Sequence, residues 1–338
     1  MKLLHMMTAV AAVAFAISPA QAQDYPKMTL RYSSNIPEVV NTSKIDTYFS
    51  SEIEKRSGGN IKIQHFWANT LGGEAEIVDL VGSGAIDLGL IVMGNQQARM
   101  PFAAVTNALP ATFTDGPTVN KITRDLFTSN ETIKAELDAA NLHPLIYRYL
   151  PDYRIYCNDP VKTMEDFKNR KIRSYGSFVP KMFEALGAVP VNIPPVDMIQ
   201  AMQSGAMDCT YMFNSAVKAF KVDQVADYGT DISFGVISAH TLFISKEKWE
   251  SWPQDVRTLF EETAADAEKF GNELIAADEA KAISELEASG MEIVPFEEMD
   301  KLKADIPDML DLWVKQMAET TGKEAEAKEV ADYIRENR

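Results

Sequence analysis

The sequence contains very little cysteine. Two cysteines, Cys157 and Cys209, occur among 338 residues, and a pair in a chain of this length is not the disulfide framework of a small secreted domain. Both lie in apolar, strand-like segments, where a buried free thiol is common. We therefore expect the two cysteines to remain unpaired, although an oxidising compartment would permit a bridge.

Histidines and catalytic motifs are also scarce. Beyond the N-terminal segment the histidines are His65, His143 and His240, and none belongs to a recognisable motif. There is no HExxH, no GxSxG, no phosphate-binding loop and no Rossmann glycine fingerprint. Most carboxylates fall at helical spacings that are typical of solvated surfaces. The sequence thus predicts no catalytic residue, no metal ligand and no cofactor. An enzyme with an unrecognised carboxylate pair is the alternative.

Basic residues are fewer than acidic ones: the chain has 33 Lys and Arg and 49 Asp and Glu, which gives a net charge of −16. Nucleic acids and anionic membrane surfaces are bound through basic faces, so both are excluded as partners. An acidic surface keeps exported proteins soluble and apart, which favours a monomer. A basic pocket can still lie inside an acidic protein, so the charge of a small ligand is left open.

Long hydrophobic runs are absent except at the N-terminus. Lys2 precedes an apolar run over residues 3–17, and Ala20-Gln21-Ala22 has the small residues that signal peptidase cuts. The run is too short to cross a bilayer comfortably, so it predicts a signal peptide and not an anchor. We expect residues 1–22 to be removed, the mature chain to begin at Gln23, and the protein to be a soluble exported one.

One pentapeptide is used twice, as Ser83-Gly84-Ala85-Ile86-Asp87 and as Ser204-Gly205-Ala206-Met207-Asp208. Each copy follows a helix-like stretch and leads into an apolar, strand-like one. The glycine can adopt the left-handed conformation that closes a helix, and the Asp can bond local backbone at the turn. The repeat indicates one supersecondary unit used in two lobes, with a cleft between them that can bind a ligand.

Strands and helices alternate along the rest of the chain, which predicts an α/β protein with right-handed crossovers and mostly parallel sheets. The stretch Pro253–Ser289 has no proline inside and predicts one long helix that braces both lobes. We assign residues 23–149 plus about 236–278 to lobe I, and residues 150–235 plus about 279–338 to lobe II. The expected strands cover residues 28–33, 61–66, 88–93, 144–150, 154–157, 171–173, 189–191, 210–213 and 232–244.

Arg173 is the best candidate for ligand binding. It ends a short predicted strand, immediately before Ser174-Tyr175-Gly176, and open α/β sheets bind ligands at the carboxyl ends of their strands. A guanidinium there can hold a carboxylate through two parallel hydrogen bonds. The alternative is an ion pair that only holds the lobe together, and it applies equally to Arg148 and Arg154. Several tyrosines fall at strand ends but are as well suited to the core: Tyr149, Tyr153, Tyr156, Tyr175 and Tyr211.

Eight short segments occur in a characteristic order and spacing: residues 56–59, 61–66, 70–72, 82–87, 166–168, 171–173, 186–188 and 201–208. Through these segments the chain resembles a known family, the DctP-type solute-binding subunits of TRAP (tripartite ATP-independent periplasmic) transporters. The resemblance covers nearly the whole mature chain and implies two α/β lobes that close on one small anion and deliver it to small and large membrane subunits. It also implies that Arg173 pairs with the ligand carboxylate, that Arg154 is the nearest match to a second arginine, and that Asn35 and Glu74 are polar pocket residues.

Several positions depart from the family pattern. Val92-Met93 replaces a glutamate found in sialic-acid-type members, Cys209 replaces a glycine, and Asn214 lies two residues beyond a usual asparagine. The resemblance therefore favours a small organic acid over a polyol, in an otherwise apolar and aromatic pocket. A receptor for a sulfonate or another oxyanion, and a sensory binding protein, are the alternatives. The expected ligand-binding residues are Arg173, Arg154, Asn35, Glu74, Met93, Tyr175, Tyr211 and Asn214.

Overall fold

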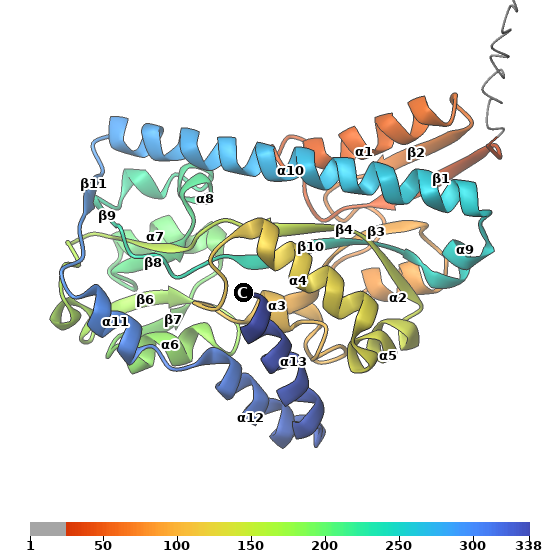
Figure 1. Cartoon of the computed structure of the whole chain (residues 1–338). Helices are drawn as coiled ribbons and strands as arrows, with labels where there is room; N and C mark the ends of the chain where they lie inside the picture. The colour runs from red at the N-terminus through yellow and green to blue at the C-terminus, as the bar shows by residue number, and fades with distance from the viewer. Residues whose placement is uncertain (1–24) are drawn as a thin grey trace, which may run out of the picture.

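The computed structural model describes residues 25–338, so the predicted signal peptide lies outside the described residues. The chain forms two β-sheets, each covered by helices, and α10 (Gln254–Ala288) runs across the top of both (Figure 1). This is the α/β, two-lobed architecture with a long bracing helix that the sequence predicts. Within the described part of the chain, no helix is long and apolar enough to cross a membrane.

The first lobe contains a five-stranded sheet in the order β2-β1-β3-β10-β4. Strands β2, β1 and β3 are parallel, as crossover connections require. Strand β10 is antiparallel to both of its neighbours, while the other four strands run in one direction, so the expectation of a mostly parallel sheet is confirmed. The strands are β1 (Met28–Ser33), β2 (Ile61–Phe66), β3 (Leu88–Val92), β4 (Leu142–Leu150) and β10 (Ile237–Ser245).

The second lobe contains a six-stranded sheet in the order β11-β9-β5-β8-β6-β7. Strands β8, β6 and β7 are parallel, whereas β5 is antiparallel to β8 and β9. Like β10, β5 enters its sheet directly from the other lobe, and no crossover helix dictates its direction. The strands are β5 (Arg154–Cys157), β6 (Lys171–Ser174), β7 (Val189–Asn192), β8 (Cys209–Met212), β9 (Tyr228–Thr230) and β11 (Glu292–Val294).

Helices follow most strands, and many of them pack against a sheet, as α1 (Ser43–Arg56) does against β2. In the first lobe, Phe49 of α1 meets Phe260 of α10 edge to face, with ring centres 5.7 Å apart. The other helices are α2 (Ile77–Gly82), α3 (Val105–Ala108), α4 (Gly116–Ser129), α5 (Glu131–Ala139), α6 (Val179–Ala185), α7 (Met198–Gln203), α8 (Asn214–Ala219), α9 (Lys246–Ser251), α11 (Met299–Asp305), α12 (Met309–Thr321) and α13 (Glu324–Asn337). The 3₁₀ turns are η1 (Met93–Gln96), η2 (Met164–Phe167), η3 (Pro195–Asp197) and η4 (Val222–Gln224).

The two pentapeptides form the same turn in the two lobes. Gly84 and Gly205 both have the left-handed φ, +72° and +70°, and close α2 and α7. Asp87 exchanges two hydrogen bonds with Arg31, its backbone N–H donating to the Arg31 carbonyl (3.1 Å) and its carboxylate accepting from the Arg31 N–H (2.6 Å). Asp208 does the same with Lys171, at 2.8 Å each. Each Asp therefore fixes the start of its strand against the neighbouring one.

The lobes are joined by two crossing segments, residues 151–153 and 231–236, in addition to α10. Tyr153 N–H donates to the Gly235 carbonyl, and Phe234 N–H donates to the Tyr153 carbonyl, both at 2.9 Å. Asp152 adds its carboxylate, which accepts from the Ser233 hydroxyl (2.6 Å) and the Gly235 N–H (3.0 Å). The two segments thus form one hydrogen-bonded strap between the sheets.

The C-terminal helices α12 and α13 pair below the sheets (Figure 1) and contact both lobes. Tyr333 donates its hydroxyl to Asp125 of α4 (2.7 Å), on the first lobe. Lys181 of α6, on the second lobe, donates to Gln316 (3.3 Å). Because the hairpin touches both, the assignment of residues 309–338 to lobe II, like the other lobe boundaries, stays a prediction.

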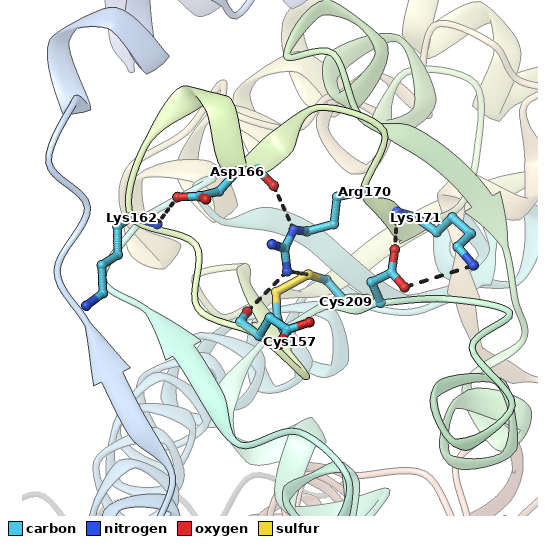
Figure 2. Close-up of a disulfide and its surroundings, with 8 residues drawn as sticks. Cys157, Lys162, Asp166, Arg170, Lys171 and Cys209 are labelled. Atoms are coloured by element: carbon cyan, nitrogen blue, oxygen red, sulfur yellow. Dashed lines mark hydrogen bonds and ion pairs between the residues drawn. A yellow bond between two sulfur atoms is a disulfide. The ribbon is translucent and has the colours of Figure 1, made fainter.

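The two cysteines are bonded to each other, so the expectation of free thiols is wrong. Cys157 of β5 and Cys209 of β8 lie opposite each other in the ladder, with Cα atoms 4.0 Å apart. Figure 2 shows the Arg170 guanidinium beside the bridge, with Nη1 4.0 Å from Cys209 Sγ. The pairing depends on the register of two strands 52 residues apart, which the local sequence around each cysteine does not reveal.

Candidate functional site

Arg173 lies at the carboxyl end of β6 and is 5% exposed. Its Nε donates to the Ile193 carbonyl (2.9 Å) and its Nη1 donates to the Tyr211 carbonyl (3.0 Å). No Asp or Glu among residues 25–338 forms an ion pair with it, and burial lowers the pKa of its guanidinium. A buried cation without a counter-ion is costly unless an anion compensates it. Arg173 is therefore held by two backbone carbonyls, and not by the structural ion pair that was the alternative to ligand binding.

Three tyrosines surround this guanidinium. The Tyr175 ring centre lies 5.4 Å from Arg173 Cζ, a distance at which a cation is attracted to a ring face. Tyr211 stacks on Tyr153 with ring centres 4.6 Å apart, and Tyr175 lies 6.0 Å from Tyr211 and 6.1 Å from Tyr153. Burial raises the pKa of all three hydroxyls, so they remain neutral donors. The structure thus brings together Arg173, Tyr175 and Tyr211 as expected.

Tyr153 was not among the expected site residues. It belongs to a crossing segment and is fully enclosed by the other aromatic rings, with Phe213 edge to face at 5.4 Å. Its position immediately before β5 was the only signal in the sequence, and many core tyrosines share that signal. Its place beside Arg173 depends on the packing of β5 next to β8, which is set at long range.

Asn35 and Glu74 meet on the first lobe, beyond the carboxyl end of β1. Asn35 Nδ2 donates to Glu74 Oε1 (2.8 Å), and Asn95 donates to the other carboxylate oxygen. Gln96 Nε2 donates to the Glu74 backbone carbonyl (3.0 Å). Asn35 Oδ1 is buried without a partner among the described residues. Asn35, Glu74 and Gln96 line a small cavity of about 10 Å³, together with Ser33, Asn69, Ile77, Leu90 and Val92.

This cavity occupies the same place in the first lobe as Arg173 does in the second. Arg31 and Lys171 are equivalent, because each exchanges two hydrogen bonds with the Asp of its pentapeptide. Two residues further along, Ser33 therefore corresponds to Arg173. Three residues beyond each Asp, Leu90 corresponds to Tyr211. The two lobes thus present equivalent strand ends, one carrying a cation and the other carrying hydrogen-bond acceptors.

Met93 and Arg154 are less available for a ligand. Met93 begins η1 and is buried in the apolar core. Arg154 forms an ion pair with Asp152 (3.2 Å) and donates from Nη1 to the Thr230 carbonyl (3.3 Å), while its Nε is buried with no partner in residues 25–338. The guanidinium is therefore already committed to the crossing segment and to β9 in this arrangement. The roles of both residues in binding stay predictions.

Asn214 begins α8 and is fully engaged within the protein. Its Oδ1 accepts from the Tyr156 hydroxyl (2.5 Å), and its Nδ2 donates to Glu279 Oε2 of α10 (2.9 Å). Each end of the amide therefore has a partner within the protein. The structure therefore does not bring it together with Arg173 as a contact residue, and its binding role stays a prediction.

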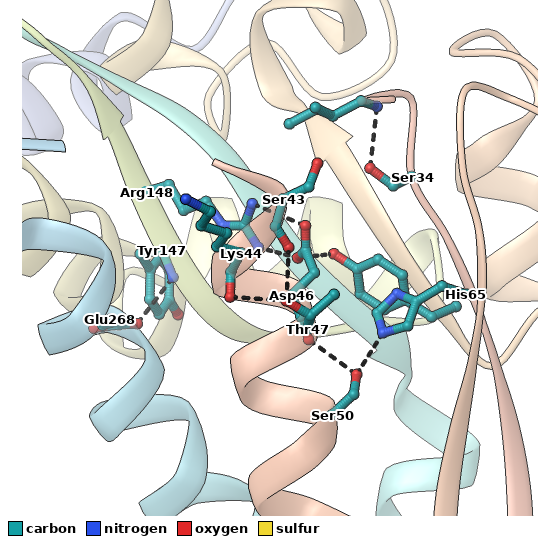
Figure 3. A network of polar contacts seen from close by, with 12 residues as sticks. Ser34, Ser43, Lys44, Asp46, Thr47, Ser50, His65, Tyr147, Arg148 and Glu268 are labelled. Atoms are coloured by element: carbon teal, nitrogen blue, oxygen red, sulfur yellow. Dashed lines mark hydrogen bonds and ion pairs between the residues drawn. The ribbon is translucent and has the colours of Figure 1, made fainter. Parts of the chain in front are cut away.

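Arg148, in contrast, serves the fold. Figure 3 shows its guanidinium beside Asp46 in the first turn of α1. The carboxylate of Asp46 also accepts a hydrogen bond from the Tyr32 hydroxyl. Arg148 is 4% and Asp46 is 1% exposed. A carboxylate this deeply buried requires such partners. The ion-pair alternative is thus confirmed for Arg148, whose partner lies 102 residues away. No group of three or more potential metal ligands occurs in residues 25–338.

Comparison with known proteins agrees with this architecture. Residues 35–321 match the bacterial extracellular solute-binding proteins, family 7. The C4-dicarboxylate-binding periplasmic protein DctP of Rhodobacter capsulatus is 23% identical over 295 residues, which cover 86% of each chain. A TRAP periplasmic solute-binding protein from Xanthobacter autotrophicus, solved with bound β-D-galacturonate, is 21% identical with a TM-score of 0.71, over 91% of this chain and all of that one.

A third relative carries a different kind of ligand. The TRAP solute-binding protein from Rhodoferax ferrireducens, solved with copurified benzoate, is 19% identical with a TM-score of 0.75 and covers 92% of this chain and 98% of that one. The match of the family spans most of the described residues, and the two-lobed fold is shared with these structures. The chain therefore belongs to family 7 of the bacterial extracellular solute-binding proteins and is a solute-binding subunit of a TRAP transporter.

Proposed function

We propose that this subunit captures a small organic acid anion between its two lobes in the periplasm and delivers it to the membrane subunits of the transporter. The observation that carries the proposal is Arg173, a buried guanidinium at a strand end with no carboxylate partner in residues 25–338. A carboxylate placed there would receive charge-assisted hydrogen bonds in a site of low dielectric. Closure of the lobes would add contacts that exist only around a bound ligand.

The rest of the ligand would meet two different surfaces. On the second lobe, Tyr175 offers a partly exposed ring next to the guanidinium, which suits a flat or apolar part of the ligand. On the first lobe, Asn35 Oδ1 and the Glu74 carboxylate are acceptors, which suit a hydroxyl or another donor. The relatives are named or solved with a C4-dicarboxylate, a uronic acid and benzoate. All three ligands carry a carboxylate, and the proposal for this chain is confined to that shared group.

The remaining expectations belong to the same proposal. Residues 1–22 would be a cleaved signal peptide that exports the chain to the periplasm, where the named relative DctP also resides. The subunit would act as a monomer without catalysis, because its task is capture and release. Its partners would be one small and one large membrane subunit.

A ligand screen tests the proposal directly. The melting temperature of the mature protein would be measured with succinate, D-galacturonate, benzoate and benzenesulfonate, since a ligand that binds the native state raises it by mass action. We expect at least one carboxylate to raise the melting temperature of the wild type and to have no effect on an Arg173→Ala variant. A rise with the sulfonate alone would favour the oxyanion alternative. No rise with any carboxylate, combined with no copurified acid in native mass spectra, would overturn the proposal.

A further inference from the structure

The long helix α10 makes polar contacts with both lobes, and more of its side chains contact the first lobe than the second. Toward the first lobe, Glu268 accepts from the Tyr147 N–H (2.9 Å) and pairs with Arg124, and Asp266 pairs with Arg56 at 2.6 Å. Toward the second lobe, Glu279 is the only α10 side chain that forms a hydrogen bond in the described part of the chain. The polar connection between the bracing helix and the second lobe therefore rests on one carboxylate.

Glu279 holds the start of α8 with both of its oxygens. Oε1 accepts from the Ser215 N–H (2.8 Å), and Oε2 accepts from the Asn214 N–H (3.2 Å) and from Asn214 Nδ2 (2.9 Å). No Lys, Arg or His among residues 25–338 forms an ion pair with this carboxylate. Hydrogen bonds from N–H groups to an ionised carboxylate are about twice as strong as neutral ones. Three of them on one side chain fix the position of α8 relative to α10.

The residues held by Glu279 lead directly into the candidate site. Asn214 is three residues beyond Tyr211, whose backbone carbonyl accepts from Arg173 Nη1 (3.0 Å). Asn214 also accepts from the hydroxyl of Tyr156 on β5 (2.5 Å), which adds the next strand of the sheet to the same network. The carboxyl end of β8 is thus fixed on one side by Arg173 and on the other by Glu279.

We propose that Glu279 is a positioning residue, through which α10 sets the place of β8 and Arg173 relative to the first lobe. The inference rests on the proposed function, since it assigns Glu279 a part in the same anion site without contact to the anion. Because α10 is bonded to the first lobe at Glu268, the Glu279 contact transmits the orientation of that lobe to the strand end that supports Arg173. Without the Glu279 contact, the carboxyl end of β8 and the Tyr211 carbonyl that holds Arg173 are less firmly fixed, and the affinity for the anion falls.

Hydrogen exchange of the unliganded mature protein tests this without knowledge of the ligand. In a Glu279→Gln variant we expect exchange to become about tenfold faster in two separate segments, residues 209–219 and residues 171–176. A capping contact with only local importance would accelerate exchange at residues 214–219 and leave residues 171–176 unchanged, and that result would overturn the proposal. Glu273→Gln is the matched control, because Glu273 lies on the same helix with an exposed side chain, and it should change neither segment.

Binding provides the second readout. For whichever of succinate, D-galacturonate and benzoate binds the wild type, Glu279→Gln should raise the dissociation constant about tenfold, mainly through faster dissociation. An unchanged constant would also overturn the proposal. If the wild type binds none of the three, the proposed function has failed for these acids, while the exchange experiment still decides the role of Glu279. Should Glu279→Gln not fold, Glu279→Asp keeps the carboxylate but shortens its reach to Asn214 and Ser215, and the absence of faster exchange in residues 171–176 would then reject the proposal.

Discussion

The guanidinium of Arg173 is bonded to the backbone carbonyl of Tyr211, 3.0 Å from Nη1, and to no carboxylate among residues 25–338. The carbonyl orients the guanidinium but carries no net charge, so the positive charge remains uncompensated in a buried place. The site is therefore built to favour an anion by electrostatics and by the fork geometry together.

Arg173→Ala should weaken binding of the ligand by on the order of 2–5 kcal/mol, as expected when one partner of a buried charge pair is removed. Arg173→Lys should recover only part of the loss, because an ammonium keeps the charge but cannot form two parallel bonds. Titration calorimetry measures both. Lys168→Ala is the control, since Lys168 is an exposed cation on the same lobe. Equal affinity of wild type and Arg173→Ala would remove Arg173 from the site.

Asp152 should be important for the junction between the lobes. Its carboxylate joins the two crossing segments through Ser233 and Gly235 and also pairs with Arg154. Asp152→Ala leaves these donors without an acceptor, so we expect the free energy of unfolding to fall by about 1–3 kcal/mol. Asp152→Asn keeps an acceptor oxygen and should lose less. Urea unfolding measures the difference, and equal stability of all three proteins would contradict this account of the strap.

The disulfide should contribute strongly to the stability of the second lobe. It closes a loop of about 50 residues, for which the chain-entropy model gives roughly 4 kcal/mol. A Cys157→Ala, Cys209→Ala double variant should therefore unfold at lower urea concentration than the oxidised wild type, and reduced wild type should resemble the variant. A thiol assay of the unfolded, unreduced protein should detect no free thiol. Two free thiols per chain would show that the bridge does not form.

The repeated turns allow a matched comparison of glycines. Gly84 and Gly205 have a left-handed φ, and an added Cβ at either one would meet open space. Gly84→Ala and Gly205→Ala should each lower the free energy of unfolding by about 1–2 kcal/mol through backbone strain alone. Gly73 also has open space but no such φ, so Gly73→Ala should cost nothing comparable. Similar losses at all three positions would refute the strain argument.

Local patterns were enough to predict most of the elements and the place of Arg173 at a strand end, but not strands β9 and β11 or the pairings between distant segments. The pentapeptide turns and Arg173 were recognisable because a helix stop, a strand and a strand end are written in neighbouring residues. The Cys157–Cys209 bridge, the Arg148–Asp46 pair and the Glu279–Asn214 contact each join segments more than 50 residues apart. They depend on strand register and on the path of α10, which single-sequence patterns leave undetermined. Asn214 shows the consequence, since its residue type suited a ligand and its actual partners are Tyr156 and Glu279.

Acid should destabilise the protein in part through His143. Burial, with Lys246 and Arg257 nearby, lowers its pKa to about 4 from an ordinary 6.5, and the ring stacks on Trp249 with centres 4.4 Å apart. The unfolded chain therefore binds a proton below pH 6.5 that the native chain does not bind until about pH 4. Stability contributed by the neutral ring is complete above pH 6.5 and is lost as the pH falls through this window, by up to about 3 kcal/mol. His143→Phe keeps a ring against Trp249 and cannot titrate, so its free energy of unfolding should fall less steeply between pH 6.5 and pH 4 than that of the wild type. Urea unfolding at a series of pH values measures both slopes, and parallel curves would show that His143 is protonated equally in the native and unfolded states.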